Sequence, residues 1–176
     1  MAGGAPCPRA SWQNPAMSAQ DVTLQLADPE DAPVLAAMSR DLIEAGLEWR
    51  YRTRSMRQLI AHAETATLVA RQGGTVAGFG VMKYGDERAH LVLLAVRPDV
   101  RRRGIARRLV EWLVTSAATA GVATIHVELR AGNAGAYALY RAQGFEETLR
   151  VPGYYAGRET AIRMLRLLRA PSAFDG

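Results

Sequence analysis

Two stretches of the sequence hold the residues best suited to chemistry: RRRGIARR at 101–108, and the segment from Glu128 to Tyr140. The first has five arginines and one glycine, and no acidic residue. It stands between an apolar run typical of a strand and a pattern typical of a helix. Free amides at a helix start, a glycine that admits a ligand, and arginine side chains together suit a phosphate group. This stretch therefore predicts a site for an anion such as pyrophosphate, with a solvated basic helix start as the alternative.

The second stretch begins with a strand that has one polar face, ATIHVELR at 123–130. Alternation places Glu128 on that face, together with Thr124, His126 and Arg130. Because helical segments flank this strand in the sequence, we expect it to be central and covered on both faces, where polar side chains are costly unless something uses them. Glu128 is therefore a candidate general base. The alternative is a salt bridge from Glu128 to Arg130 or to another arginine at the end of the sheet.

Asn133 and Tyr140 lie in and just before the helical segment that follows this strand. Asn133 directly precedes AGAYALYRAQ and has the residue type of a helix N-cap, so capping and ligand binding are both open. Tyr140 is either an aromatic residue of the core or a phenol that donates a proton.

Apolar periodicity indicates which elements position these residues. We expect strands at 22–27, 66–72, 75–84, 91–96, 123–130, 145–151 and 159–168, and helices at 28–46, from a capping box at 55–58, at 105–120 and at 134–143. The apolar run LVLLAV (91–96) predicts the central strand, Gly73-Gly74 predicts a tight hairpin, and the first helix should bury Val34 and Leu35. The order predicts an α/β protein with a mixed sheet, about seven strands flanked by about four helices.

Length and composition predict one domain. The chain has 176 residues, 49% of them hydrophobic, and a net charge of +5, which suits a protein that buries its own core and favours an anionic partner. We expect a loose tail at 1–20, a folded domain at 21–170 and a loose end at 171–176. The lone Cys7 allows no internal disulfide, and no signal peptide or membrane span is recognisable, so we expect a cytoplasmic protein.

Several motifs resemble those of one enzyme family. LVLLAVRPDVRRRGIARRLVEWLV resembles the [QR]xxGx[GA] region of the GCN5-related N-acetyltransferases (GNAT), and ELRAGNAGAYALYRAQGF resembles their NxxAxxLYxxxGF segment. More narrowly, VELRAGN, LYRAQGF and GYYAGRETAIRM are similar to the bacterial ribosomal-protein-alanine N-acetyltransferases. The resemblance covers roughly residues 21–168, with the motifs in the right order and spacing.

The resemblance implies a GNAT-like acyl-CoA N-acyltransferase fold and bound acetyl-CoA. Glu128 would be the general base, and Tyr140 would protonate the departing thiolate. Cofactor contacts would come from a strand end, the arginine-rich helix start and the next helix: Leu94, Ala95, Val96, Arg101, Arg102, Arg103, Gly104, Ile105, Ala106, Arg107, Asn133 and Tyr140. No metal is implied.

The acceptor side of this implied site resembles the family less closely than the cofactor side does. Aromatic residues and the implied base are the candidates for substrate binding: Trp49, Tyr51, Glu128, Tyr154 and Tyr155. The two later tyrosines fall where relatives line the acceptor groove, with a solvent-exposed turn as the alternative. The linker LEWRYRTR (47–54) does not obviously follow the relatives, and Thr160 stands where the ribosomal type carries Asp.

The implied reaction is transfer of acetyl from acetyl-CoA to a primary amine by direct attack. A protein N-terminal α-amine is the first candidate acceptor, and a small amine such as an amino acid or an aminoglycoside is the second. A third interpretation is a CoA-binding sensor without activity. The arginines are concentrated at one helix start, which argues against a nucleic-acid binder. No membrane partner is expected, and the chain is compatible with a monomer or a homodimer.

Overall fold

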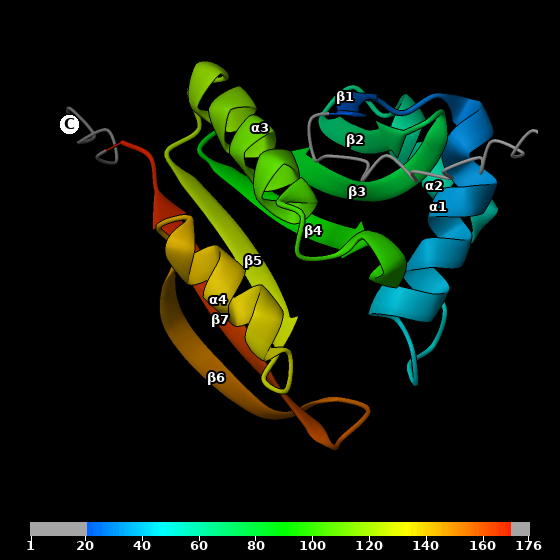
Figure 1. Ribbon diagram of the computed structural model, residues 1–176. Helices are drawn as coiled ribbons and strands as arrows, with labels where there is room; N and C mark the ends of the chain where they lie inside the picture. Colours follow the sequence, from blue (N-terminus) through cyan, green and yellow to red (C-terminus); the bar gives the residue numbers. More distant parts are fainter. Residues whose placement is uncertain (1–20, 170–176) are drawn as a thin grey trace, which may run out of the picture.

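One seven-stranded sheet organises the protein, in the strand order β1-β2-β3-β4-β5-β7-β6. The structure, a computed structural model, describes residues 21–169 (Figure 1). Its strands are β1 (Val22–Leu26), β2 (Thr65–Gln72), β3 (Thr75–Tyr84), β4 (Arg88–Val96), β5 (Thr124–Arg130), β6 (Glu146–Tyr155) and β7 (Glu159–Leu167). All neighbours are antiparallel except β4 and β5. The expected mixed sheet is confirmed, with 91–96 in its middle strand.

Four α-helices in the described residues complete the fold: α1 (Ala32–Met38), α2 (Thr53–Ala61), α3 (Ile105–Thr119) and α4 (Ala134–Ala142). Short 3-10 turns η2 (Pro29–Asp31) and η4 (Pro98–Val100) precede α1 and α3, and a π-helical turn, η3 (Ser39–Ile43), extends α1. No helix within 21–169 is long and apolar enough to cross a membrane. The expected ends at 1–20 and 171–176, and Cys7, lie outside the described residues.

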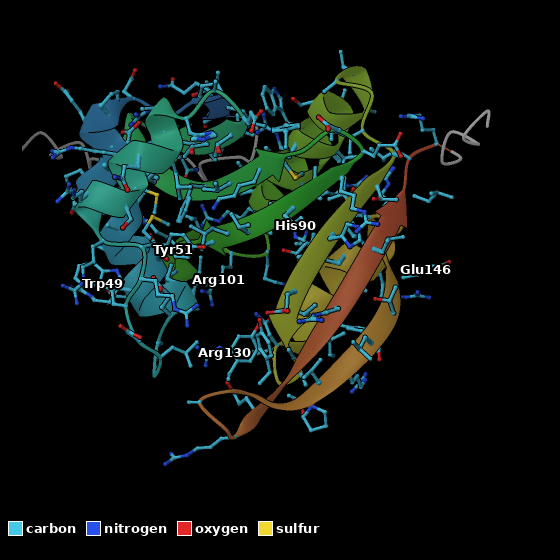
Figure 2. All side chains as sticks on the ribbon, turned by 180° about the vertical axis from the view of Figure 1, so that it is seen from behind. Trp49, Tyr51, His90, Arg101, Arg130 and Glu146 are labelled. Carbon is cyan, nitrogen blue, oxygen red and sulfur yellow. The ribbon has the colours of Figure 1, made fainter. Side chains whose placement is uncertain are left out.

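The two sheet faces are covered unequally. On one face α3 and α4 pack over a core that includes Leu109, Leu113, Ile125 and Phe145. On the other face α1 and α2 cover only the half formed by β2, β3 and β4. Figure 2 shows this second face, with β5 and β7 in front and no helix over them. The expectation that 123–130 is covered on both faces was therefore wrong.

The parallel strands β4 and β5 separate partway along their length. They pair from Arg88↔Thr124 to Leu91↔Val127, and then β4 runs on to Val96 without β5 beside it. The separation begins where β3 and β4 shift register, between Val81 and Met82. Such a bulge bends a strand and increases its twist. The outer edge of β4 beyond Leu91 is left without a neighbouring strand, close to the start of α3 (Figure 1).

Local turn and capping signals predict some boundaries of the helices and strands correctly and miss others. Gly73 and Gly74 have φ of +57° and +81°, as the β2–β3 hairpin requires. The second helix begins at Thr53, two residues before the expected capping box, and no side chain caps it within 21–169. Val34 is 41% exposed although we expected it to be buried, because the buried stripe of α1 follows Ala32, Leu35 and Ala36, and Val34 lies outside it.

Candidate functional site

The start of α3 presents free backbone amides beside an open space. Gly104 is the N-cap with φ +78°, and no side chain of residues 21–169 caps the helix. The amides of Ile105, Ala106 and Arg107 in the first turn have no intrahelical acceptor. A Cβ built on Gly104 would meet no atom within 4 Å. Together with Arg102, whose φ is +63°, this loop forms a concave set of amides suited to an anion.

The arginines around this loop differ in whether they already bind other residues. The Nε of Arg101 donates to the Val96 carbonyl at 3.0 Å, and Arg107 pairs with Glu111 at 2.7 Å. Arg102 and Arg103 are exposed and form no hydrogen bond or salt bridge with another residue between 21 and 169, although the pKa of the Asp99 carboxyl is lowered by its hydrogen bond from Arg97 and also by the charge of Arg103. Two guanidinium groups therefore remain available to an anion placed over Gly104.

The other residues assigned to the cofactor contribute mainly backbone. Ala95, Val96 and Ile105 bury their side chains in the core, and Leu94 is half-buried. Only main-chain groups of the first three can meet a ligand. Asn133 caps α4, since its Oδ1 accepts from the Ala136 amide at 3.0 Å. The capping interpretation of Asn133 is confirmed, and its contact with a cofactor stays a prediction.

Glu128 lies on the uncovered face of β5, in a small polar network. Its carboxylate accepts from Arg163 Nε at 2.9 Å and from the Tyr155 hydroxyl at 3.4 Å. Arg163 stands directly opposite on β7, so the expected alternative of a salt bridge is present, with Arg163 as the partner instead of Arg130. Glu128 is half-buried and can be reached by an acceptor from that face.

Tyr154 and Tyr155 stand beside this carboxylate at the end of β6. Their rings meet edge to face at 5.1 Å between centroids, and Tyr154 is 47% exposed. Burial first, and the Glu128 carboxylate second, raise the pKa of the Tyr155 phenol above its usual value. The hydroxyl therefore keeps its proton and serves as a donor to Glu128. The structure brings these three predicted residues together.

Tyr140 lies on the other side of β5. It is 4% exposed, packs against Phe145 with ring centroids 5.4 Å apart, and belongs to the core under α3 and α4. Burial raises the pKa of its phenol above the usual range. Its hydroxyl forms no hydrogen bond with another residue of 21–169. Tyr140 and Glu128 thus approach β5 from opposite faces.

Trp49 and Tyr51 lie in a loop that a buried carboxylate holds. The Trp49 indole donates to the Tyr51 carbonyl at 3.2 Å, and its ring is flanked by the guanidinium groups of Arg40 and Arg52. Glu44 is 7% exposed, and its carboxylate accepts from the Arg50 amide at 2.6 Å and from the Tyr51 amide at 3.3 Å. Sequence reasoning missed Glu44, because nothing local distinguishes it from a solvated glutamate at a helix end.

Replacing Glu44 with alanine should destabilise the fold by about 3 kcal/mol. The change leaves the Ser39 hydroxyl, which donates to Glu44 at 2.9 Å, and two loop amides without their acceptor. Urea unfolding followed by circular dichroism measures the loss. The Glu48→Ala variant is the matched control, because Glu48 is an exposed carboxylate of the same loop, and it should unfold like the wild type. Equal stability of both variants would contradict the anchoring role of Glu44.

Two arginines of the site were not assigned in advance. Arg163 pairs with Glu128 and lies over the Tyr154 ring at 5.6 Å. Arg130 binds Glu159 at 2.9 Å and lies over the Tyr155 ring at 5.5 Å. Alternation in 159–168 places Arg163 on a mixed face with Glu159, Ala161, Leu165 and Leu167, so the pattern does not single it out. Its partner becomes visible only with the strand register.

Comparisons with known proteins agree with this arrangement. The sequence pattern of the acetyltransferase (GNAT) family matches residues 35–145, more than half of the chain. The ribosomal protein bS18-alanine N-acetyltransferase of Escherichia coli K12 is 42% identical over 96 residues, which are 53% of this chain and 65% of that protein. An IAA acetyltransferase of Azospirillum brasilense is 35% identical over 92 residues, 51% of this chain and 60% of that protein.

Among solved structures, the ribosomal-protein-S18-alanine N-acetyltransferase from Escherichia coli superposes with a TM-score of 0.73 at 29% identity, covering 87% of this chain and 97% of that one. The matches to the two curated relatives span less than two thirds of those proteins' own lengths. The family pattern nevertheless includes the arginine-rich loop, Glu128 and Tyr140. This chain is therefore a member of the acetyltransferase (GNAT) family.

Proposed function

We propose that this protein transfers an acetyl group from acetyl-CoA to a primary amine, and that the amine is the N-terminal α-amine of a protein. The observation that carries the proposal is the separation of β4 from β5, which lies between the amide-lined start of α3 and the Glu128 carboxylate. Solved structures with similar folds were obtained with acetyl-CoA, among them a putative acetyltransferase from Salmonella typhimurium. The curated relative with 42% identity acts, by its name, on an alanine of ribosomal protein bS18.

The residues at the start of α3 fit the diphosphate of acetyl-CoA. The space over Gly104 is open, the first-turn amides are uncapped within 21–169, and neither Arg102 nor Arg103 forms a hydrogen bond or salt bridge there. Charge-assisted hydrogen bonds of this kind contribute roughly 1.5 to 3 kcal/mol each. The exposed backbone edge of β4 at Leu94 to Val96 would then hold the pantetheine arm. When bound, the thioester supplies an activated acyl group with a good leaving group.

The placement of Glu128 and Tyr140 on opposite faces of β5 supports one location for the proposed reaction. One side chain lies under the helices and the other on the uncovered face of β5. Glu128 would act on the attacking nitrogen and Tyr140 on the departing sulfur of the same acyl group, so its carbonyl should lie close to the plane of the sheet, between β4 and β5. The donor would then enter from the side of α3 and α4, and the acceptor from the face with Tyr154 and Tyr155.

The chain's own groups have separate tasks in this reaction. Glu128, directly or through a water, takes a proton from the attacking nitrogen as the new C–N bond forms. The Tyr140 phenol donates its hydrogen to the sulfur as the C–S bond breaks, and solvent restores the phenol. Unpaired amides of β4 polarise the carbonyl. Each positioned acid or base contributes on the order of 10² to 10⁴ in rate.

The α-amine is the acceptor that places the smaller demand on the base. At pH 7 an N-terminal α-amine is neutral roughly one time in seven, whereas a lysine side chain is neutral only about once in 2,500. Deprotonating the α-amine therefore costs much less free energy than deprotonating a lysine, which makes it the easier acceptor for a base such as Glu128. The exposed aromatic surface of Tyr154 suits a peptide that continues beyond its first residue.

A thiol-release assay with acetyl-CoA tests the proposed function. The acceptors would be a hexapeptide with a free N-terminal alanine, the same peptide blocked at its N-terminus but carrying a lysine, free alanine and an aminoglycoside. Mass spectrometry locates the added acetyl group. Acetylation of the free α-amine supports the proposal, and turnover only with the blocked lysine peptide overturns it. The similarity to an IAA acetyltransferase favours a small molecule as the second candidate acceptor, which the last two arms detect.

Replacing Arg103 with glutamate should weaken acetyl-CoA binding about 100-fold, because the change removes one cation and adds repulsion at the phosphate position. Isothermal titration calorimetry measures the affinity. Arg57→Glu on α2 is the control, since it makes the same charge change at an exposed site outside the proposed cofactor contacts and should leave binding unchanged. Wild-type affinity in the Arg103 variant would remove the phosphate assignment.

A further inference from the structure

Arg130 ties together two parts of the protein that are distant in sequence. At the end of β5 its Nη2 donates to the Ile43 carbonyl at 3.1 Å and to the Ala45 carbonyl at 2.8 Å. Its Nη1 binds Glu159 at 2.9 Å, and the guanidinium lies over the Tyr155 ring. These bonds reach back 87 and 85 residues along the chain. One side chain thus joins β5, the β6–β7 hairpin and the end of η3.

The bond to η3 crosses the region where β4 and β5 separate. Ile43 ends η3, on the half of the protein that α1 and α2 cover, while Arg130 belongs to the half with the uncovered face. Carbonyls at the end of a helical segment lack intrahelical partners and carry partial negative charge, so a guanidinium binds them well. Figure 2 shows Arg130 at the end of β5, on the side toward Trp49 and Tyr51.

The turn that Arg130 holds is also the turn that positions the loop at 44–52. Glu44 lies between the two carbonyls that Arg130 binds, and the Glu44 side chain accepts from the Arg50 and Tyr51 amides. The backbone of this turn is therefore fixed from one side by Arg130, while its carboxylate fixes the loop. Any displacement of the turn would carry Tyr51 with it.

We propose that Arg130 is a positioning residue for the acceptor: it sets the distance between the 44–52 loop and the β6–β7 hairpin, which are the two walls beside Glu128. This inference rests on the proposed function and names the residue that shapes the acceptor side of that site. Arg130 contacts no reacting atom. It acts through Tyr155 and through the turn at Glu44, and it matters most for an acceptor long enough to touch both walls.

Two substitutions test the role. Arg130→Lys keeps the charge but loses the planar fork that reaches Glu159 and both carbonyls, and Arg130→Met removes the charge at similar length. We expect KM for the hexapeptide with a free N-terminal alanine to rise about tenfold in the lysine variant, because one or two hydrogen bonds are lost. The rise should be larger in the methionine variant. The kcat, the acetyl-CoA affinity and the KM for a small free amine should stay within about threefold of the wild type.

Arg166→Lys is the matched control. Arg166 also donates to a carbonyl at a helix end, that of Gln143 at 2.6 Å, but within one half of the protein. It should leave the peptide KM unchanged. A peptide KM that stays at the wild-type value in both Arg130 variants overturns the proposal. So does an equal rise for the peptide and the small amine, because that would indicate general damage to the fold.

Hydrogen exchange gives a readout that does not depend on turnover. The Arg50 and Tyr51 amides should exchange faster in Arg130→Lys than in the wild type, while the amides of α3 keep their protection. Unchanged exchange at Arg50 and Tyr51 overturns the positioning role. If the wild type acetylates no amine at all, the proposed function fails, and this measurement still decides whether Arg130 fixes the loop.

Discussion

Replacing Glu128 with glutamine is expected to lower kcat for an amine acceptor by about 10² to 10⁴, with acetyl-CoA affinity unchanged. The amide has the shape of the carboxylate but cannot take up a proton. Residue 128 lies on the uncovered face of β5, away from the start of α3, so we expect the substitution to leave acetyl-CoA binding unchanged. Steady-state thiol release measures kcat, and isothermal titration calorimetry measures the affinity.

A surface carboxylate provides the control for this variant. Glu147 accepts from Arg150 at 2.6 Å, as Glu128 accepts from Arg163, but its partner belongs to its own strand, β6. Glu147→Gln should keep full activity. Both variants should be about as stable as the wild type, since half-exposed ion pairs contribute only about 0 to 1 kcal/mol. Full activity of Glu128→Gln at neutral pH would leave Glu128 as the structural partner of Arg163.

Local signals were sufficient to predict most of the fold. The Gly73-Gly74 pair marks a hairpin because only a residue without Cβ adopts those angles readily. The apolar run at 91–96 predicts the middle strand because both of its faces are packed, one under α3 and the other under α1 and η3. Asn133 predicts a helix start since its side chain reaches the amide three residues on.

Long-range partners set the limits of that prediction. Glu128 lies on a polar face that we expected to be covered, but α1 and α2 reach only the strands up to β4, which depends on how the whole chain folds. The pairing of Arg130 with the Ile43 carbonyl joins residues 87 positions apart, and no pattern within either segment indicates it. The same holds for Glu44, whose role depends on where a linker of irregular structure turns back.

The phenol of Tyr140 is the second group whose removal should have a large effect. Tyr140→Phe is expected to lower kcat by about 10² or more, because the departing sulfur loses its hydrogen-bond and proton donor. The fold should keep about its stability, since the hydroxyl forms no hydrogen bond with another residue of 21–169 and phenylalanine keeps the contact with Phe145. Thiol release and thermal unfolding, measured on one preparation, separate the two effects.

Tyr84→Phe is the opposite case and serves as the control for Tyr140→Phe. Tyr84 donates its hydroxyl hydrogen to Ser116 Oγ at 3.0 Å, away from the start of α3. Loss of this hydrogen bond should lower the free energy of unfolding by about 1 kcal/mol and leave kcat unchanged. If Tyr140→Phe turns over like the wild type, Tyr140 is a packing residue only. A stable Tyr140 variant with low kcat, beside a less stable Tyr84 variant with normal kcat, is the result expected when the Tyr140 hydroxyl serves the reaction and not the fold.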